Sequence, residues 1–186
     1  MKRSLILAGC LAVVCGVAGC QKNHEGVSVI VEGQGRFPPS LAGRWREGKR
    51  GWEFVFERDG RISSAVIDSG MIRVTPGHRD IEVATQKLKG YYRLGPWTAQ
   101  YSPEGRELSV GVVVESFHLD TGDFVLKGSS ADWFVGPVSQ DWQKWEAQWY
   151  SFPQVTASAE YEQDLVFEQD PNENPVGTLV FTKQPG

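Results

Sequence analysis

Hydrophobic and polar residues alternate along most of the chain after residue 40, with the period of two that is typical of β-strands. In "WEFVFE", for example, Trp52, Phe54 and Phe56 share one side of the predicted strand. Similar stretches are "RISSAVI", "MIRVT", "DIEVA", "YYRLGPWTAQY", "ELSVGVVVESFHL", "DFVLKG", "DWFVGPV", "DLVFE" and "GTLVFT". Turn sequences rich in Gly, Pro and Asp separate them. The pattern predicts a mainly β fold, a single antiparallel β-barrel or β-sandwich domain.

The stretch "SQDWQKWEAQWYSF" has two interpretations. Trp142, Trp145 and Trp149 are spaced as on one face of a helix, whereas Trp145, Ala147 and Trp149 would share one face of a strand. The aromatic neighbours and the turn-like "SQD" favour a strand in a hairpin, and the helix is the alternative.

The first residues have a different pattern. Lys2 and Arg3 precede an apolar run of 14 residues from Leu5 to Ala18. A membrane-spanning helix needs about 20 apolar residues. A short basic start, a short apolar run and an exit through small residues are typical of a secretory signal peptide.

The exit Val17-Ala18-Gly19-Cys20 resembles the lipobox of bacterial lipoproteins. The resemblance implies a signal peptide over residues 1–19, cleavage before Cys20, a diacylglycerol on its thiol and an amide-linked acyl chain such as palmitate. The implied location is the bacterial cell envelope, facing the periplasm or the cell surface. Gln21 is not the Asp that retains enterobacterial lipoproteins at the inner membrane, so the outer membrane is favoured.

Residues 20–35 are expected to form the lipidated N-terminus and a tether, in which "VSVIVEG" could add one edge strand. The break "FPPS" follows, and the β domain is expected over residues 36–186. Cys10 and Cys15 would leave with the signal peptide and the lipid would block Cys20. No disulfide is therefore expected, nor thiol or zinc chemistry.

Without Lys2 and Arg3 the mature chain has 17 basic and 23 acidic residues, a net charge of −6. Residues 36–106 carry 13 basic and 8 acidic side chains, whereas residues 107–186 carry 3 and 13. This distribution favours two halves of one domain whose opposite charges help them close; two surfaces with different partners are the alternative. The net negative charge and the exported location argue against a nucleic-acid partner.

"LAGRW" comes before the strand "WEFVFE", with Gly43 and Trp45 as its characteristic residues. This Gly-x-Trp at the first strand resembles the opening of lipocalin-like (calycin) β-barrels. The resemblance implies a barrel-like shape, with Trp45 closing its floor. In that family the barrel holds an apolar ligand.

Asp120-Thr121-Gly122 in "LDTGD" is the tripeptide that carries each catalytic aspartate of aspartic proteases. Asp123 stands where that family has Ser or Thr, and no second such tripeptide occurs in the chain. A hairpin turn is therefore favoured. A hydrolase acting on envelope material through Asp120 and Asp123 is kept as the alternative function.

The sequence predicts neither a metal site nor a cofactor. His24, His78 and His118 lie far apart, and no phosphate-binding or dinucleotide-binding motif occurs. "DPNENP", residues 170–175, resembles the start of an EF-hand loop, but it lacks the central Gly and the final Glu of that loop. A solvated turn is favoured here.

The seven tryptophans are the unusual feature of the composition. Most are expected to fill the core, although exposed indoles would stack on sugars. Six residues that mix cations with aromatic rings form a candidate ligand surface, namely Arg44, Trp45, Arg46, Trp52, Trp145 and Trp149. The favoured function is non-catalytic: binding of a small, lipid or glycan ligand, or scaffolding of envelope proteins.

Overall fold

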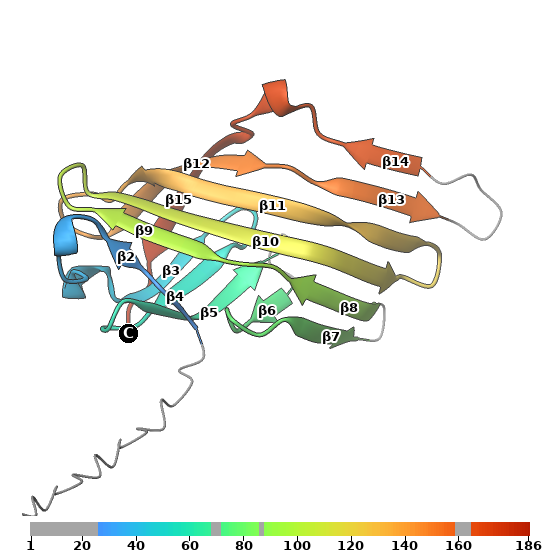
Figure 1. Cartoon of the computed structure of the whole chain (residues 1–186), viewed down its shortest axis with the longest axis horizontal. Coiled ribbons are helices and arrows are strands. Elements are labelled where there is room, and N and C mark those ends of the chain that lie inside the picture. Colours follow the sequence, from blue (N-terminus) through green and yellow to red (C-terminus); the bar gives the residue numbers. More distant parts are fainter. Residues whose placement is uncertain (1–25, 68–71, 86–87, 159–164) are drawn as a thin grey trace, which may run out of the picture.

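A computed structural model describes residues 26–67, 72–85, 88–158 and 165–186. The fold is mainly β, as the alternation predicts, and it is a strongly curled, antiparallel half-barrel (Figure 1). The strands of the first half of the chain are β1 (Val27–Ser28), β2 (Ile30–Val31), β3 (Gly43–Glu47), β4 (Glu53–Phe56), β5 (Arg61–Ile67), β6 (Ile72–Val74), β7 (Asp80–Ala84), β8 (Lys89–Leu94) and β9 (Thr98–Ser102). Those of the second half are β10 (Glu107–Asp120), β11 (Val125–Pro137), β12 (Lys144–Ser151), β13 (Gln154–Ser158), β14 (Leu165–Glu168) and β15 (Gly177–Lys183). Three short 3₁₀ helices are η1 (Glu32–Gln34), η2 (Pro39–Leu41) and η3 (Pro171–Glu173).

β10 and β11 form a hairpin of the two longest strands. The main path of the sheet has the order β1-β5-β4-β3-β15-β12-β11-β10-β8-β7. β9 and then β8 pair with successive parts of β10, and β12 and then β13 pair with successive parts of β11. The hairpin therefore has two environments. We call the part formed with β3, β4, β5, β9, β12 and β15 the closed end, and the part formed with β7, β8, β13 and β14 the open end.

The segment that was expected to be a tether contributes to the closed end. β1 pairs with β5, and β2 pairs in parallel with β9. Val29, between them, is only 8 % exposed, and its N–H donates to the carbonyl oxygen of Gly60 at 2.8 Å. This segment is not an edge strand, because it pairs with a different strand on each side.

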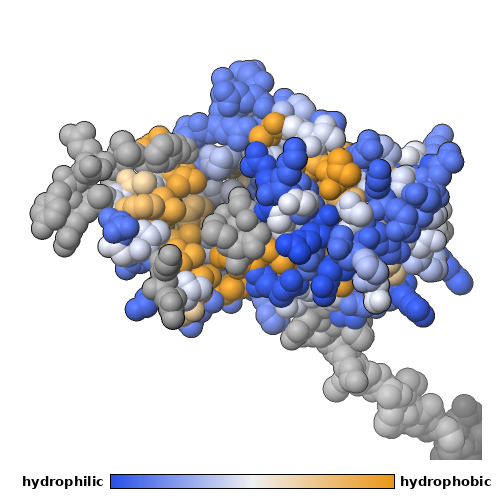
Figure 2. All heavy atoms as spheres, turned by 180° about the vertical axis from the view of Figure 1, so that it is seen from behind, coloured by the Kyte–Doolittle hydropathy of each residue, from blue (hydrophilic) through white to orange (hydrophobic). Residues whose placement is uncertain are grey.

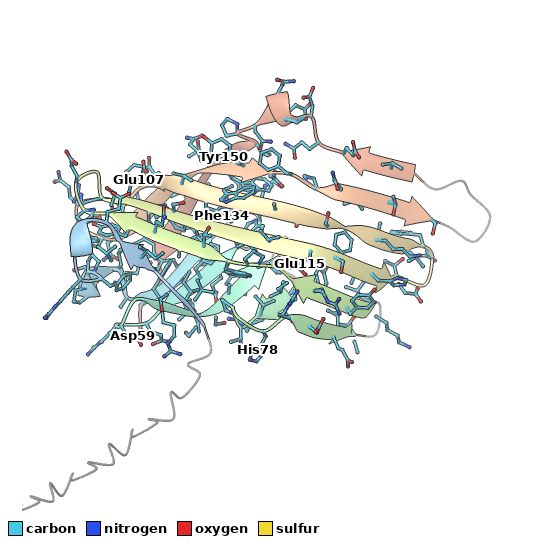
Figure 3. All side chains as sticks on the ribbon, in the orientation of Figure 1. Asp59, His78, Glu107, Glu115, Phe134 and Tyr150 are labelled. Atoms are coloured by element: carbon cyan, nitrogen blue, oxygen red, sulfur yellow. The ribbon has the colours of Figure 1, made fainter. Side chains whose placement is uncertain are left out.

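A cluster of aromatic rings fills the closed end, with Phe54 of β4 at its centre. The Phe54 ring centroid lies 5.6 Å from those of Phe134 and Phe181 and 6.0 Å from that of Trp145. Figure 3 shows Phe134 in the C-terminal part of β11. All four side chains are fully buried. Aromatic residues bury large apolar areas, so this cluster is a major source of stability in a fold for which no disulfide is expected.

A β-bulge marks the passage from the closed end to the open end. The pairing of β10 with β11 shifts register between Val114 and Phe117. An inserted residue bends a strand and changes which residues face inward. Val112 and Val114 face the interior before the bulge, and Phe117 and Leu119 do so after it.

Three predicted stretches differ from the observed strands. "YYRLGPWTAQY" is divided into β8 and β9, because Gly95–Trp97 interrupt the pairing and the two parts meet different portions of β10. "DFVLKG" and "DWFVGPV" lie in a single strand, β11. Gly128 permits the close approach of β13, its antiparallel neighbour, because a Cβ atom at this position would lie 2.1 Å from the carbonyl oxygen of Gln154.

The strand interpretation of the tryptophan-rich stretch is confirmed. Trp145, Ala147 and Trp149 lie on β12 and all three are buried, with exposed residues between them. Trp142 lies in the preceding turn, with a positive φ of 59°. A helix would have placed Trp142 and Trp145 on one face, which the structure excludes.

The two oppositely charged halves of the chain meet along two lines of pairing, β3 with β15 and β8 and β9 with β10. Arg79 and Glu115 form an ion pair of 2.9 Å between the halves. Glu115 lies on β10 close to β8 (Figure 3). The observed arrangement is that of two halves of one sheet. Both partners of this ion pair are exposed, so its own contribution to stability is small.

Candidate functional site

A cavity of about 380 Å³ lies on the inner side of the curled sheet, where the closed end gives way to the open end. Its lining comes from β5, β10, β11, β12 and β13 and from residues in and beside β4 and β8. Figure 2 shows the face opposite to that of Figure 1. Hydrophobic residues gather on this face toward the left of the view, over the open end. The cavity lining includes residues of the open end, such as Leu126 and Val155.

Aromatic rings form much of the cavity wall. Trp52 and Trp149 line it next to the closed end, and Tyr92 and Phe117 line it in the open end. The rings of Tyr92 and Phe117 are stacked with centroids 5.7 Å apart, and Tyr92 is 2 % exposed. Such packed rings present a rigid apolar surface to a ligand.

Aliphatic residues continue the wall along the β10–β11 hairpin. Val112, Val114 and Leu119 come from β10, Leu126 from β11 and Val155 from β13. Val112 is almost fully buried, whereas Leu126 and Val155 are only half-buried. Leu119, beside the hairpin turn, is also almost fully buried, so the lining is less buried on β11 and β13 than on β10.

A polar cluster interrupts this apolar wall. Asp132 and Ser151 are cross-strand partners on β11 and β12, and Ser130 lies two residues from Asp132 on the same face of β11. Asp132 is 5 % exposed, and its Oδ1 accepts a hydrogen bond of 2.9 Å from Nε1 of Trp149. The hydroxyl of Thr121 is a separate polar group of the lining, near the hairpin turn. A buried carboxylate is costly unless hydrogen-bonded, so Trp149 is a structural partner of Asp132.

The segment "DPNENP" holds this polar wall in place. Asn174 Oδ1 accepts from the N–H of Ser151 at 2.8 Å, and Asn174 Nδ2 donates to the Ser151 carbonyl oxygen at 3.0 Å. Asp170 caps η3 by accepting from the N–H of Asn172 at 2.8 Å. These side chains fix a turn, as expected for this segment.

The β3–β4 loop is held against Trp149 from another side. The Arg50 guanidinium lies 4.3 Å from the centroid of the Trp149 ring, a cation–π contact. Glu47 fixes the loop by accepting from the N–H groups of Lys49 at 2.8 Å and Gly51 at 3.2 Å. Arg50 is exposed and is not part of the cavity lining.

The six residues of the candidate ligand surface do not form one surface. Trp52 and Trp149 line the cavity. Trp45 and Trp145 are fully buried in the core of the closed end. Arg44 and Arg46 are exposed and point outward, because they alternate with Trp45 along β3.

Trp45 lies where the first and last long strands meet. Its Nε1 donates to the Leu41 carbonyl oxygen of η2 at 2.8 Å, and Lys183 Nζ of β15 lies 5.9 Å from the ring centroid. Lys183 also donates to the Ser40 carbonyl oxygen at 2.7 Å. Trp45, Trp52, Trp97, Trp145 and Trp149 are all buried, which confirms that most of the tryptophans fill the core.

The "LDTGD" sequence forms the predicted hairpin turn. β10 ends at Asp120 and β11 begins at Val125. Asp120 Oδ1 accepts from the N–H of Gly122 at 2.8 Å, and the Thr121 Oγ1 atom accepts from the N–H of Phe124 at 3.2 Å. Asp120 therefore has a structural partner in the turn, and Asp123 is exposed on it.

Within the described residues no group of three or more His, Cys, Asp or Glu side chains is placed to hold a metal ion. Among the same residues no helix is long and apolar enough to cross a membrane. The lipobox residues Val17, Ala18, Gly19 and Cys20 lie outside the described residues.

The chain matches none of the family models, curated proteins or solved structures with which it was compared. The function must therefore be argued from the cavity and the sequence.

The sequence analysis missed Asp132, Ser130 and Ser151. The only available signal was a charged residue within the otherwise apolar "ADWFVG". Whether this charged residue faces a cavity depends on the register between β11 and β12, which cannot be read from the sequence.

Proposed function

We propose that this protein is a lipid-anchored lipoprotein of the bacterial envelope whose β domain binds a small, largely apolar ligand in the cavity described above. The observation that carries the proposal is a cavity lined mainly by aromatic and aliphatic side chains on the inner side of a curled sheet. Its volume of about 380 Å³ lies within the range of roughly 300–1,000 Å³ for small-molecule sites.

Apolar binding is favoured over glycan binding by the placement of the tryptophans. A glycan platform needs an exposed indole, whereas the rings of Trp52 and Trp149 are 5 % and 8 % exposed and face the cavity. The resemblance of Gly43 and Trp45 to lipocalin-like barrels supports the same class of ligand, since that family holds apolar ligands within its barrel.

The anchor is proposed from the lipobox alone. Cys20 lies six residues before Gly26, where the described structure begins. Six extended residues span at most about 20 Å, so a lipidated Cys20 would hold the domain close to the bilayer. One acyl chain gives a membrane affinity of about 10⁴ M⁻¹, and two or three give a stable attachment. The membrane itself is then a nearby source of apolar ligands.

We propose binding rather than catalysis, because Asp120 caps its own turn and Asp123 lies exposed beside it. The envelope hydrolase is the competing hypothesis. A role as a scaffold for envelope proteins would not require the cavity, so an experiment on the cavity separates it from ligand binding.

The binding proposal is tested on residues 20–186 carrying Cys20→Ser, which we call the unlipidated chain. The probe is N-phenyl-1-naphthylamine, a neutral apolar dye whose fluorescence rises when it leaves water. We expect saturable binding to the unlipidated chain and loss of binding in Val155→Trp, which fills the cavity from β13. Val180→Trp is the matched control, because Val180 is 43 % exposed on β15 and is not part of the lining.

Equal dye binding by Val155→Trp and Val180→Trp would refute the cavity as the binding site. The anchor is tested separately, by mass spectrometry of the mature protein from a bacterial host. We expect an N-terminal Cys20 carrying diacylglycerol, and an uncleaved precursor in Cys20→Ser. An unmodified Cys20, or a mature chain beginning elsewhere, would refute the anchor.

A further inference from the structure

The polar cluster of the cavity defines the kind of ligand that fits, given the proposed binding function on which this inference rests. We propose that the cavity takes an amphiphile whose polar end donates hydrogen bonds and carries no negative charge, an alkylammonium or a long-chain alcohol. Asp132 is the residue that determines this specificity. The same carboxylate disfavours a fatty acid or another anionic amphiphile.

The position of Asp132 gives the orientation of the ligand. Asp132 lies on the part of β11 that pairs with β12, next to the closed end, whereas Leu126 lies beside the hairpin turn. The two residues are six positions apart along the strand, a distance of about 20 Å. Since Asp132 is 5 % exposed whereas Leu126 is half-buried, the polar end would lie deep, against Asp132, and the chain would extend toward the open end.

The chemistry of the cluster selects a donor. A carboxylate can only accept hydrogen bonds, and the hydroxyls of Ser130 and Ser151 can accept as well. Asp132 is 5 % exposed and faces an apolar cavity, where solvent screening is weak. An ammonium or hydroxyl group placed there would gain a charge-assisted hydrogen bond. A ligand carboxylate would instead be brought against a buried charge of its own sign.

Arg50, a cation close to Trp149, does not reverse this preference. Arg50 lies 4.3 Å from the Trp149 ring centroid but is exposed and is absent from the lining. The Trp149 indole N–H is itself directed to Asp132. An anionic group inside the cavity would therefore meet Asp132 rather than the guanidinium of Arg50.

The experiment compares three amphiphiles with the same ten-carbon chain, decylamine, decanol and decanoate, as competitors for the bound dye. It uses the unlipidated chain, which contains every described residue, at pH 7 and at amphiphile concentrations below micelle formation. We expect decylammonium to displace the dye at a concentration about tenfold or more below that of decanoate, with decanol between them. Decanoate binding as tightly as decylammonium would overturn the proposal and would point to Arg50.

The variant Asp132→Asn keeps an acceptor for Trp149 but removes the charge. In this variant we expect decylammonium to displace the dye only at an about tenfold higher concentration, and decanoate to displace it at a lower concentration than before. The displacing concentration of decanol should change by less than about threefold. Asp123→Asn, the same substitution at an exposed site outside the lining, should leave all three values unchanged. Preserved selectivity in Asp132→Asn would also overturn the assignment.

These outcomes separate the inference from the proposed function. Dye binding that survives Val155→Trp defeats the binding proposal itself, whatever the order of the competitors. Dye binding that is lost in Val155→Trp, combined with no preference among the three amphiphiles, leaves the binding function intact and refutes the role of Asp132. The competition on the unsubstituted chain decides the specificity even if Asp132→Asn fails to fold.

Discussion

The two ends of the β10–β11 hairpin have the same inward-facing pattern but very different interiors. At the closed end Phe134 packs edge-to-face on Phe54 of β4 and Phe181 of β15, neither of which is a strand next to β11. At the open end Phe117 and Leu126 face the cavity and remain half-buried. The two ends differ in the residues that pack against the inner face of the hairpin, and not in the hairpin strands themselves. A hollow can therefore arise where a sheet stops closing, without any special sequence on its walls.

The comparison predicts that the same Phe→Ala substitution lowers the free energy of unfolding much more at the closed end than at the open end. Phe54→Ala should lower the free energy of unfolding by about 3–5 kcal/mol, because it leaves a void among packed rings. Phe117→Ala should cost about 1 kcal/mol, because its site already borders a cavity. Urea unfolding of the unlipidated chain measures both. Similar losses for the two variants would show that the open end is packed as tightly as the closed end.

The second prediction concerns the segment that pairs on both sides of the closed end. Val29→Ala removes apolar groups that are 8 % exposed and should cost about 1.5–2 kcal/mol, at about 0.8 kcal/mol for each buried methylene-sized group. Ile30→Ala is the control, because Ile30 is 63 % exposed, and it should change stability by less than about 0.5 kcal/mol. If both substitutions are neutral, the segment behaves as a tether.

A third prediction concerns alkaline pH and the closed end alone. Burial raises the pKa of Tyr101, which is 2 % exposed, above its usual value of 10.0. The folded protein then holds the phenolic proton more tightly than the unfolded chain does. The stability from this group is complete below pH 10 and is lost as the pH rises through the folded-state pKa. Unfolding curves at increasing pH should show this loss, and Tyr101→Phe should reduce it. An identical pH dependence in Tyr101→Phe would refute the role of Tyr101.

The smallest effect is expected at the turn that ends the open part of the hairpin. Asp120→Asn should change stability by less than about 0.5 kcal/mol, because Asn can also accept the N–H of Gly122. Any activity on envelope material should also be unaffected. The measurement is urea unfolding together with an assay of envelope hydrolysis. Loss of a hydrolytic activity with stability unchanged would favour the competing hydrolase hypothesis.

The sequence predicted the parts of the fold that depend on local pattern. Alternation identified Trp52, Phe54 and Phe56 as residues on one side of a strand. The residue types of "DTGD" predicted a hairpin turn. It did not predict that Val27–Val31 joins β5 to β9, since that pairing depends on strands far along the chain. The alternation also implied that Arg44 and Trp45 face opposite sides of β3. The candidate ligand surface nevertheless included both residues, because it was chosen by residue type alone, and this prediction was wrong.

The cavity could not be predicted for a similar reason. Asp132 and Ser151 meet only because β11 and β12 pair in one particular register. Phe117 and Leu119 face inward only because the bulge after Val114 changes the side to which odd-numbered residues point. A shift of one residue in either strand would turn these side chains to the other face. Such registers are set by the whole sheet.

The pairing of β15 with β3 also determines when the domain can fold. The partners Phe181 and Glu47 stand at opposite ends of the chain, and Lys183 reaches Ser40 across 143 positions of sequence. Contacts of such long range form late and slow the overall reaction. The closed end cannot assemble before β15 has been synthesised, because β15 lies between β3 and β12 in the sheet. A chain that stops before Gly177 would lack β15 and would leave both β3 and β12 without this neighbour.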